Sequence, residues 1–222
     1  MAQAQLLPFP ELVTKSEAPA ARRIREHGVA SLTDVELFSY LIGPEGAALL
    51  SAQRQSRWIG VDYQALRAKG LGEEEALRFL ACLDFARRML HRKLETAQLL
   101  NEPHLVASYT FLRHSRGDQE VLGAVFLDTR NRLIADEVFF RGTLDRAHVD
   151  PRPVLKRGLE LDAAGFVIFH NHPSSDPAPS SDDLAFTRQM TDAAEAVGLE
   201  MHDHLIVGAT DRWVSLRRRG GW

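Results

Sequence analysis

The apolar side chains of the N-terminal part of the chain recur with a helical period. A short helical pattern after Ala20 ends at Gly28, which suits a helix C-cap, and a second pattern begins with Ser31 or Thr33 as its N-cap. A third run, residues 73–95, predicts a helix with one largely apolar face. The positions on that face are Leu77, Leu80, Ala81, Asp84, Phe85, Arg88 and Met89. No strand pattern interrupts these helices, so this part of the chain is predicted to be all-α.

In the C-terminal part the period changes from helical to extended. Residues 120–128 and 132–142 flank the turn residues 129–131, and the two segments are predicted to pair as a hairpin. The remaining pattern predicts helices at 153–163 and 180–198 and strands at 164–170, 201–208 and 212–217. This mixture of helices and strands indicates an α/β domain.

The two patterns meet near Pro103, which interrupts the helical period. We therefore predict an N-terminal helical domain at residues 1–98, a linker at 99–104 and a second domain at 105–222. The fold class predicted for the second domain is α/β, a mixed sheet with flanking helices. With 222 residues, 45% of them hydrophobic, the chain is long enough for both units to bury a core.

Composition and charge exclude several classes of protein. The formal net charge is −3, and basic and acidic residues nearly balance within residues 1–100, so the whole chain is not an electrostatic nucleic-acid binder. No apolar run approaches the ~18 residues that a membrane span needs, and residues 1–13 lack the features of a signal peptide. The single Cys82 cannot form an internal disulfide, so we expect a cytoplasmic protein. The arginines at 217–219 are expected to form a solvated C-terminal edge.

Residues 169–183 read FHNHPSSDPAPSSDD and carry the candidate chemistry. Side chains alternate along a strand, so His170 and His172, at the end of a predicted strand, project to the same side. Ser180 is the predicted N-cap of the next helix, which places Asp183 in its first turn, at the mouth of the same loop. Two imidazoles and one carboxylate can therefore converge.

Imidazole nitrogens and a carboxylate oxygen suit Zn²⁺, which in catalytic sites is held by three protein ligands and keeps a fourth position for water. Each part has an ordinary alternative. A histidine beside an apolar strand usually only forms a hydrogen bond, and a Ser-x-x-Asp start is a common helix cap. The combined spacing of His170, His172, Ser180 and Asp183 is more specific than either part alone, and it predicts a metal site.

The sequence HNHP at 170–173, followed by Ser180 and Asp183, resembles the JAMM motif of MPN-type metalloproteases. Residues 118–217 are similar to the RadC family in particular, and residues 22–43 resemble the N-terminal helical segment of that family. The resemblance implies an MPN/JAMM-like fold with a cytidine-deaminase-like core, a Zn²⁺ cofactor and hydrolysis of an amide bond in a peptide or protein substrate.

The resemblance also implies roles for individual residues. The three metal ligands would be His170, His172 and Asp183. Ser180 would donate a hydrogen bond to the developing oxyanion, and a glutamate on an earlier strand would act as general base. Glu120 and Glu137 are the candidates, and we favour Glu120 because it opens the first strand. His204 is expected to support the site or the core rather than to bind the metal.

In the RadC family the N-terminal part resembles a helix-hairpin-helix DNA-binding unit, whose glycine turn offers backbone N–H groups to a phosphate. The turn Gly70-Leu71-Gly72 is retained here, but three carboxylates follow it directly, at positions 73–75. Their negative charge would repel a phosphate. We therefore expect DNA binding by residues 1–100 to be weak or undetectable.

Three functions compete on these observations. The one we favour is a zinc-dependent metallopeptidase or isopeptidase. The second is a DNA-associated, repair-linked accessory protein, which would need a basic groove that the charge balance of residues 1–100 does not supply. The third is a catalytically silent MPN scaffold, a class that usually loses the metal ligands retained here. The motif defines the chemistry and leaves the substrate open.

Overall fold

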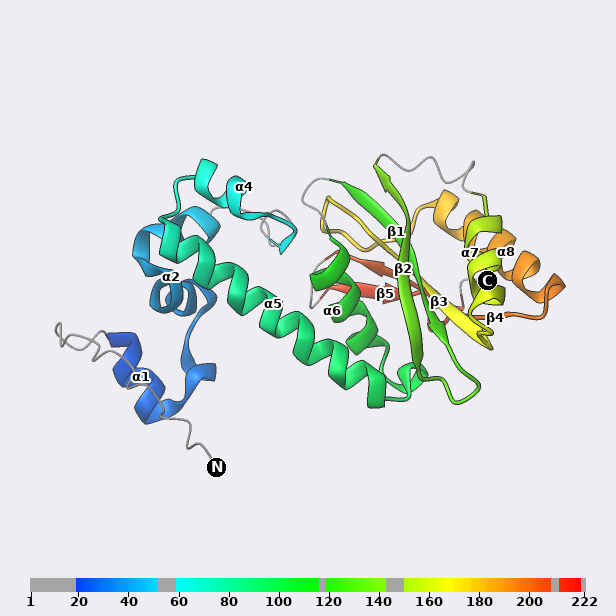
Figure 1. Cartoon of the computed structure of the whole chain (residues 1–222), viewed down its shortest axis with the longest axis horizontal. Helices are drawn as coiled ribbons and strands as arrows, with labels where there is room; N and C mark the ends of the chain where they lie inside the picture. The colour runs from blue at the N-terminus through cyan, green and yellow to red at the C-terminus, as the bar shows by residue number, and fades with distance from the viewer. Residues whose placement is uncertain (1–18, 52–58, 116–118, 143–149, 209–211, 221–222) are drawn as a thin grey trace, which may run out of the picture.

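The computed structural model describes residues 19–51, 59–115, 119–142, 150–208 and 212–220, so residues 1–13, discussed above for a signal peptide, lie outside the described part. It confirms the predicted α/β class, with a helical N-terminal region (Figure 1). The helices are α1 (Pro19–His27), α2 (Asp34–Ser51), α4 (Tyr63–Ala68), α5 (Glu73–Thr96), α6 (Pro103–His114), α7 (Arg152–Glu160) and α8 (Ser181–Ala196). Short 3₁₀ turns lie at η1 (Val29–Ser31) and η2 (Leu99–Asn101). The strands are β1 (Glu120–Leu127), β2 (Leu133–Gly142), β3 (Gly165–Asn171), β4 (Glu200–Val207) and β5 (Trp213–Ser215).

The five strands form one mixed sheet in the order β2-β1-β3-β4-β5. β1 pairs antiparallel with β2, which confirms the predicted hairpin, and antiparallel with β3 on its other edge. β3 and β4 are parallel and are connected through α8, and β5 closes the edge antiparallel to β4. α6 packs on one face of the sheet, while α7 and α8 pack on the other (Figure 1). Because both faces are covered, every residue of β3 is buried.

The helix α5 connects the helical region to the sheet (Figure 1), and its buried face differs from the predicted one. Leu77, Phe85 and Met89 are 51%, 66% and 50% exposed, so the predicted apolar face is wrong. The buried positions are Ala76, Phe79, Leu83 and Leu94. Apolar residues occur on both sides of α5, and periodicity cannot tell which side other helices will cover. Although α5 has 24 residues, neither it nor any other helix in the described part is long and apolar enough to span a membrane.

The sequence pattern does not predict helix α6, because Pro103 interrupts the helical period. Pro103 instead stands at the first turn of α6, where a missing N–H costs nothing because the first N–H groups of a helix have no partner inside it. The predicted linker, 99–104, comprises η2 and the start of this helix. Leu99 is buried in the core beneath the sheet, and its N–H donates to the Asn131 carbonyl at 3.1 Å. The segment is therefore packed, and the division into two domains at this point stays a prediction.

A polar network ties α5 and α6 to the sheet. Asp136 of β2 accepts hydrogen bonds from the Tyr109 hydroxyl at 2.8 Å, from Arg113 Nε at 3.0 Å and from His114. On α5, His91 Nδ1 lies 3.0 Å from the same tyrosine hydroxyl. Burial raises the pKa of Asp136, but the hydrogen bond from His114 and the positive charges beside it outweigh burial and lower the pKa to about 2. The carboxylate of Asp136 is therefore charged at neutral pH. It links β2 to α6 directly and to α5 through the hydroxyl of Tyr109.

Candidate metal centre

The candidate ligands lie where β3 ends beside the start of α8. His170 and His172 occupy the end of β3 and the position just after it, and both rings project to the side of the sheet that α8 covers. His170 is completely buried, whereas the side chain of His172 is 14% exposed. One imidazole is therefore fixed within the core, and the other borders solvent.

Asp183 lies in the first turn of α8 and meets both histidines. Its Oδ1 is 3.2 Å from His170 Nε2 and its Oδ2 is 3.7 Å from His172 Nε2, while the two Nε2 atoms are 2.9 Å apart. A tetrahedral zinc with bonds of about 2.1 Å separates its ligand atoms by roughly 3.4 Å. The three observed separations bracket that value, with a different oxygen of Asp183 nearest to each histidine, so these residues are compatible with a metal ion.

The hydrogen bonds of the two imidazoles identify which nitrogen faces the centre. His172 Nδ1 lies 2.7 Å from the carbonyl oxygen of Asp176, which can only accept, so Nδ1 carries the proton and Nε2 presents its lone pair. His170 Nδ1 faces His204 Nε2 at 2.7 Å and can donate to it in the same way. Two nitrogen lone pairs and a carboxylate then converge on one point, an arrangement that a cation stabilises.

Ser180 holds Asp183 in place through a capping box. The Ser180 backbone N–H and hydroxyl donate to Asp183 Oδ2 at 2.8 and 2.7 Å, and Ser180 Oγ accepts from the Asp183 N–H at 3.2 Å. The same contacts that begin the helix therefore orient the carboxylate toward the histidines. Ser180 and Asp183 were both singled out from the sequence, and the structure brings them together.

The two candidate glutamates occupy different places. Glu120 opens β1, and its Oε1 lies 4.0 Å from His172 Nε2. One ligand atom from each of Glu120, His170 and His172 lies within 4.8 Å of the other two. Glu137 on β2 instead forms an ion pair with Arg157 of α7, with Oε1 2.6 Å from Nε. The geometry therefore places the carboxylate of Glu120, and not that of Glu137, beside the histidines.

Asn171, between the two histidines, fixes the backbone on both sides of Glu120. It projects to the opposite side of β3, where its Oδ1 accepts from the Val121 N–H at 2.8 Å and its Nδ2 donates to the Gln119 carbonyl at 3.2 Å. The side-chain amide thus bridges the end of β3 to the start of β1. This role is not predictable from the sequence, because it depends on a strand pairing between residues 50 positions apart.

A buried chain of hydrogen bonds supports His170 from behind. His204 on β4 is completely buried, and its Nδ1 lies 2.7 Å from the hydroxyl of Thr187 on α8. That hydroxyl donates in turn to the carbonyl oxygen of Asp183 at 2.6 Å. The chain therefore connects two candidate ligands, His170 and Asp183, through His204 and Thr187. His204 has the supporting position expected for it, whereas Thr187 was missed, although its spacing of four residues from Asp183 places both on one helix face.

Comparisons with known proteins agree with this architecture. A family profile described as a RadC-like JAB domain matches residues 100–221. The UPF0758 protein of Cellvibrio japonicus is 36% identical over 220 residues, covering 92% of this chain and 98% of the relative. The UPF0758 protein of Cupriavidus pinatubonensis is 37% identical over 207 residues, covering 86% and 91%. That of Roseiflexus castenholzii is 33% identical over 209 residues, covering 89% of each chain. The chain therefore belongs to the RadC family of JAB-domain proteins.

Proposed function

We propose that this protein is a zinc-dependent metallopeptidase or isopeptidase that hydrolyses an amide bond in a peptide or protein. The observation that carries the proposal is the convergence of two Nε2 atoms and one carboxylate at 2.9–3.7 Å, with a second carboxylate at 4.0 Å. Three of these groups, from His170, His172 and Asp183, would hold the metal. The fourth, from Glu120, remains for proton transfer.

A bound zinc would lower the pKa of a coordinated water toward ~7 and so supply a nucleophile at neutral pH. Glu120 lies beside His172 at the more exposed side of the centre, with its side chain 17% exposed. From there its carboxylate would accept the proton of the attacking water and pass it to the leaving amine. Asn171 would keep this carboxylate at its position by holding the backbone on either side of it.

Ser180 would donate a hydrogen bond to the oxyanion that forms on the substrate carbonyl. In this structure its hydroxyl donates to Asp183 Oδ2 instead, at 2.7 Å. The proposed role therefore requires the hydroxyl to rotate, while the backbone N–H of Ser180, at 2.8 Å, keeps Asp183 in place. One residue would then serve the ligand through its backbone and the substrate through its side chain.

For the helical region we propose a structural or protein-docking role rather than DNA binding. In a helix-hairpin-helix unit the N–H groups near the glycine turn bind a phosphate. Here the Gly72 N–H donates to Glu75 Oε2 at 2.8 Å, within the capping box that begins α5. The group that a phosphate would need already binds a carboxylate of the same chain. The exposed free thiol of Cys82 supports our proposal of a reducing, cytoplasmic location.

The test combines metal content with hydrolysis. Protein purified without a metal-affinity tag should contain about one zinc per chain, and His172→Ala should lose most of it. Glu120→Gln should keep the zinc and lose at least about 100-fold of the cleavage rate of peptide and isopeptide reporters, because the amide cannot accept the proton. Glu137→Gln is the matched control, since Glu137 pairs with Arg157 away from the histidines.

Different outcomes would contradict different parts of the proposal. Zinc content that is low in the wild type and unchanged in His172→Ala would remove the metal site. Loss of cleavage in Glu137→Gln but not in Glu120→Gln would transfer the role of base and leave the reaction class intact. A zinc-loaded protein that cleaves no peptide or isopeptide reporter would favour the silent scaffold.

A further inference from the structure

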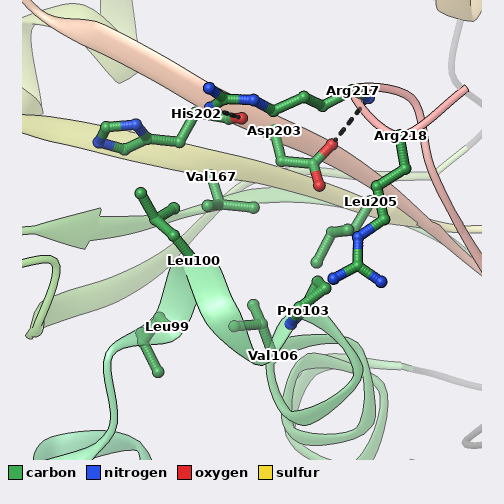
Figure 2. A pocket seen from close by; sticks show the side chains of 10 residues that line it. All are labelled: Leu99, Leu100, Pro103, Val106, Val167, His202, Asp203, Leu205, Arg217 and Arg218. Atoms are coloured by element: carbon green, nitrogen blue, oxygen red, sulfur yellow. Dashed lines mark hydrogen bonds between the residues drawn. The ribbon is translucent and has the colours of Figure 1, made fainter. Parts of the chain in front are cut away.

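A cavity of about 300 Å³, lined by the residues labelled in Figure 2, lies on the face of the sheet that α6 covers, opposite the candidate metal centre. Sites for small molecules typically occupy roughly 300–1,000 Å³, so this one has room for a single group of modest size. Its apolar wall is contributed by η2, α6, β3 and β4. The residues of this wall are Leu99, Leu100, Pro103, Val106, Val167 and Leu205.

The arginines at 217–219 are all exposed, as expected for a solvated edge, and two of them, Arg217 and Arg218, also border the cavity. In Figure 2 the guanidinium of Arg218 extends over the cavity beside Leu205 and Pro103. Arg217 Nη1 donates to the His202 carbonyl at 2.9 Å, which fixes this side chain along the edge of β4. The third arginine of the run, Arg219, does not line the cavity.

A buried network fixes the turn that carries these arginines. Asp203 Oδ1 accepts from the backbone N–H of Arg217 at 3.1 Å, and Asp203 Oδ2 accepts from the Ser215 hydroxyl at 2.6 Å. Ser215 Oγ in turn accepts from the backbone N–H of Arg218 at 3.1 Å. β4 has one extra residue opposite β3 at this point, so that His202 and Asp203 both border the cavity. Buried groups thus hold the backbone from which both arginine side chains extend.

We propose that this cavity binds an apolar carboxylate, with the hydrocarbon part against the apolar wall and the carboxylate on the guanidinium of Arg218. Guanidinium groups bind carboxylates through charge-assisted hydrogen bonds in matching planar geometry. The two oxygens of Asp203 accept from the Ser215 hydroxyl and from backbone N–H groups, and not from the guanidinium of Arg218. Two sources offer this chemistry: the C-terminal residue of a polypeptide that ends in a large apolar side chain, and a small aromatic acid.

The inference is independent of the proposed hydrolase function, because none of the cavity residues belongs to the candidate metal centre. The sheet separates the two places: His204 of β4 faces the centre, whereas its neighbours Asp203 and Leu205 line the cavity. Binding in the cavity should therefore be the same before and after treatment of the protein with a metal chelator.

The test is a titration of the ¹⁵N-labelled full chain, followed by amide chemical shifts. The probes are N-acetyl-phenylalanine, its carboxamide, a tripeptide ending in phenylalanine and 3-phenylpropanoate. N-acetyl-phenylalanine should shift amides of η2, α6 and β4 and bind at least about tenfold more tightly than the carboxamide, which has the same shape without the charge. Tighter binding of the tripeptide than of 3-phenylpropanoate would identify a polypeptide C-terminus as the natural ligand. Tighter binding of 3-phenylpropanoate would identify a small aromatic acid instead.

Matched variants separate the cavity from general surface charge. Arg218→Ala should weaken the binding of N-acetyl-phenylalanine by about tenfold and leave the binding of the carboxamide unchanged. Arg219→Ala, one residue further on, should leave the binding of both compounds unchanged. Leu100→Trp should fill the space and reduce binding of every probe. Equal affinity for acid and carboxamide, an equal effect of Arg219→Ala, or no shifts around the cavity at about 10 mM probe would each overturn the proposal.

Discussion

The hydroxyl of Thr187 touches no candidate ligand side chain, yet Thr187→Val should weaken zinc binding. With Nε2 of His170 facing the centre, its Nδ1–H donates to His204, the His204 Nδ1–H donates to Thr187 Oγ1, and Thr187 donates to the Asp183 carbonyl. Each donor in this series of hydrogen bonds therefore has a single acceptor. Valine keeps the shape of threonine and removes the acceptor of the His204 proton.

The expected magnitude follows from burial. His204 and Thr187 are completely buried, so no water can replace the lost hydroxyl. A buried donor left without its partner costs about 1–3 kcal/mol of folding free energy. Loss of the direct partner of a metal-binding histidine typically weakens metal affinity by about 10–100-fold. Thr187 lies one hydrogen bond beyond that partner, His204, so its loss should weaken zinc binding by about tenfold, the lower end of this range. Thr187→Val should therefore lower both the stability of the metal-free protein and its affinity for zinc.

Two measurements keep these effects apart. Urea unfolding of the metal-free proteins gives the change in stability, and competition with a chromogenic chelator gives the zinc affinity. The matched control is Thr191→Val, the same substitution one turn later on α8, where the hydroxyl donates to the Thr187 carbonyl at 2.9 Å. The control should change zinc affinity by less than about twofold, since Thr191 is no part of the chain to His170. Equal affinities for Thr187→Val and the wild type would refute the supporting role of the chain.

Three further predictions concern other parts of the molecule. The pKa of Asp136 is lowered from 3.8 to about 2, so its charge contributes about 2 kcal/mol of stability above pH 4, and this stability is lost as the pH falls toward 2. In urea unfolding, Asp136→Asn should therefore lose less stability than the wild type over that pH range. An equal loss in both proteins would contradict this. Asn171→Ala should reduce the rate constant of hydrolysis more than zinc content, because it frees the backbone around Glu120; unchanged kinetics with loss of zinc would argue against this. DNA should bind the full chain weakly at physiological salt in fluorescence anisotropy, and submicromolar, salt-sensitive binding that is lost in Lys69→Ala and Arg78→Ala would restore the DNA hypothesis.

Those parts of the site that lie close together in sequence were predictable from it. A strand that ends in His-x-His directs both imidazoles to one side by alternation alone, and a Ser-x-x-Asp helix start places Asp183 beside the loop by capping. The hairpin of β1 and β2 follows from alternation around a short turn. In each case a local rule of backbone geometry decides the position.

The parts that could not be predicted depend on contacts between distant segments. Which side of α5 is buried depends on α2 and α4, whose residues meet Phe79 and Leu83 only after the chain has folded. The role of Asn171 depends on β1 lying beside β3, and the position of Arg218 depends on Asp203 through Ser215. Periodicity and capping carry no information about such pairings.

Strand β4 lies between the two proposed sites. Alternation directs the side chain of His204 to the candidate metal centre and those of Asp203 and Leu205 to the cavity. The backbone N–H of His204 also donates to Asp203 Oδ1 at 2.7 Å, the same oxygen that holds the turn with Arg217. Both proposed sites therefore depend on the position of one short stretch of backbone. A substitution that shifts this stretch should disturb both of them, whereas Thr187→Val and Arg218→Ala each act on one side of the sheet and should affect one site alone.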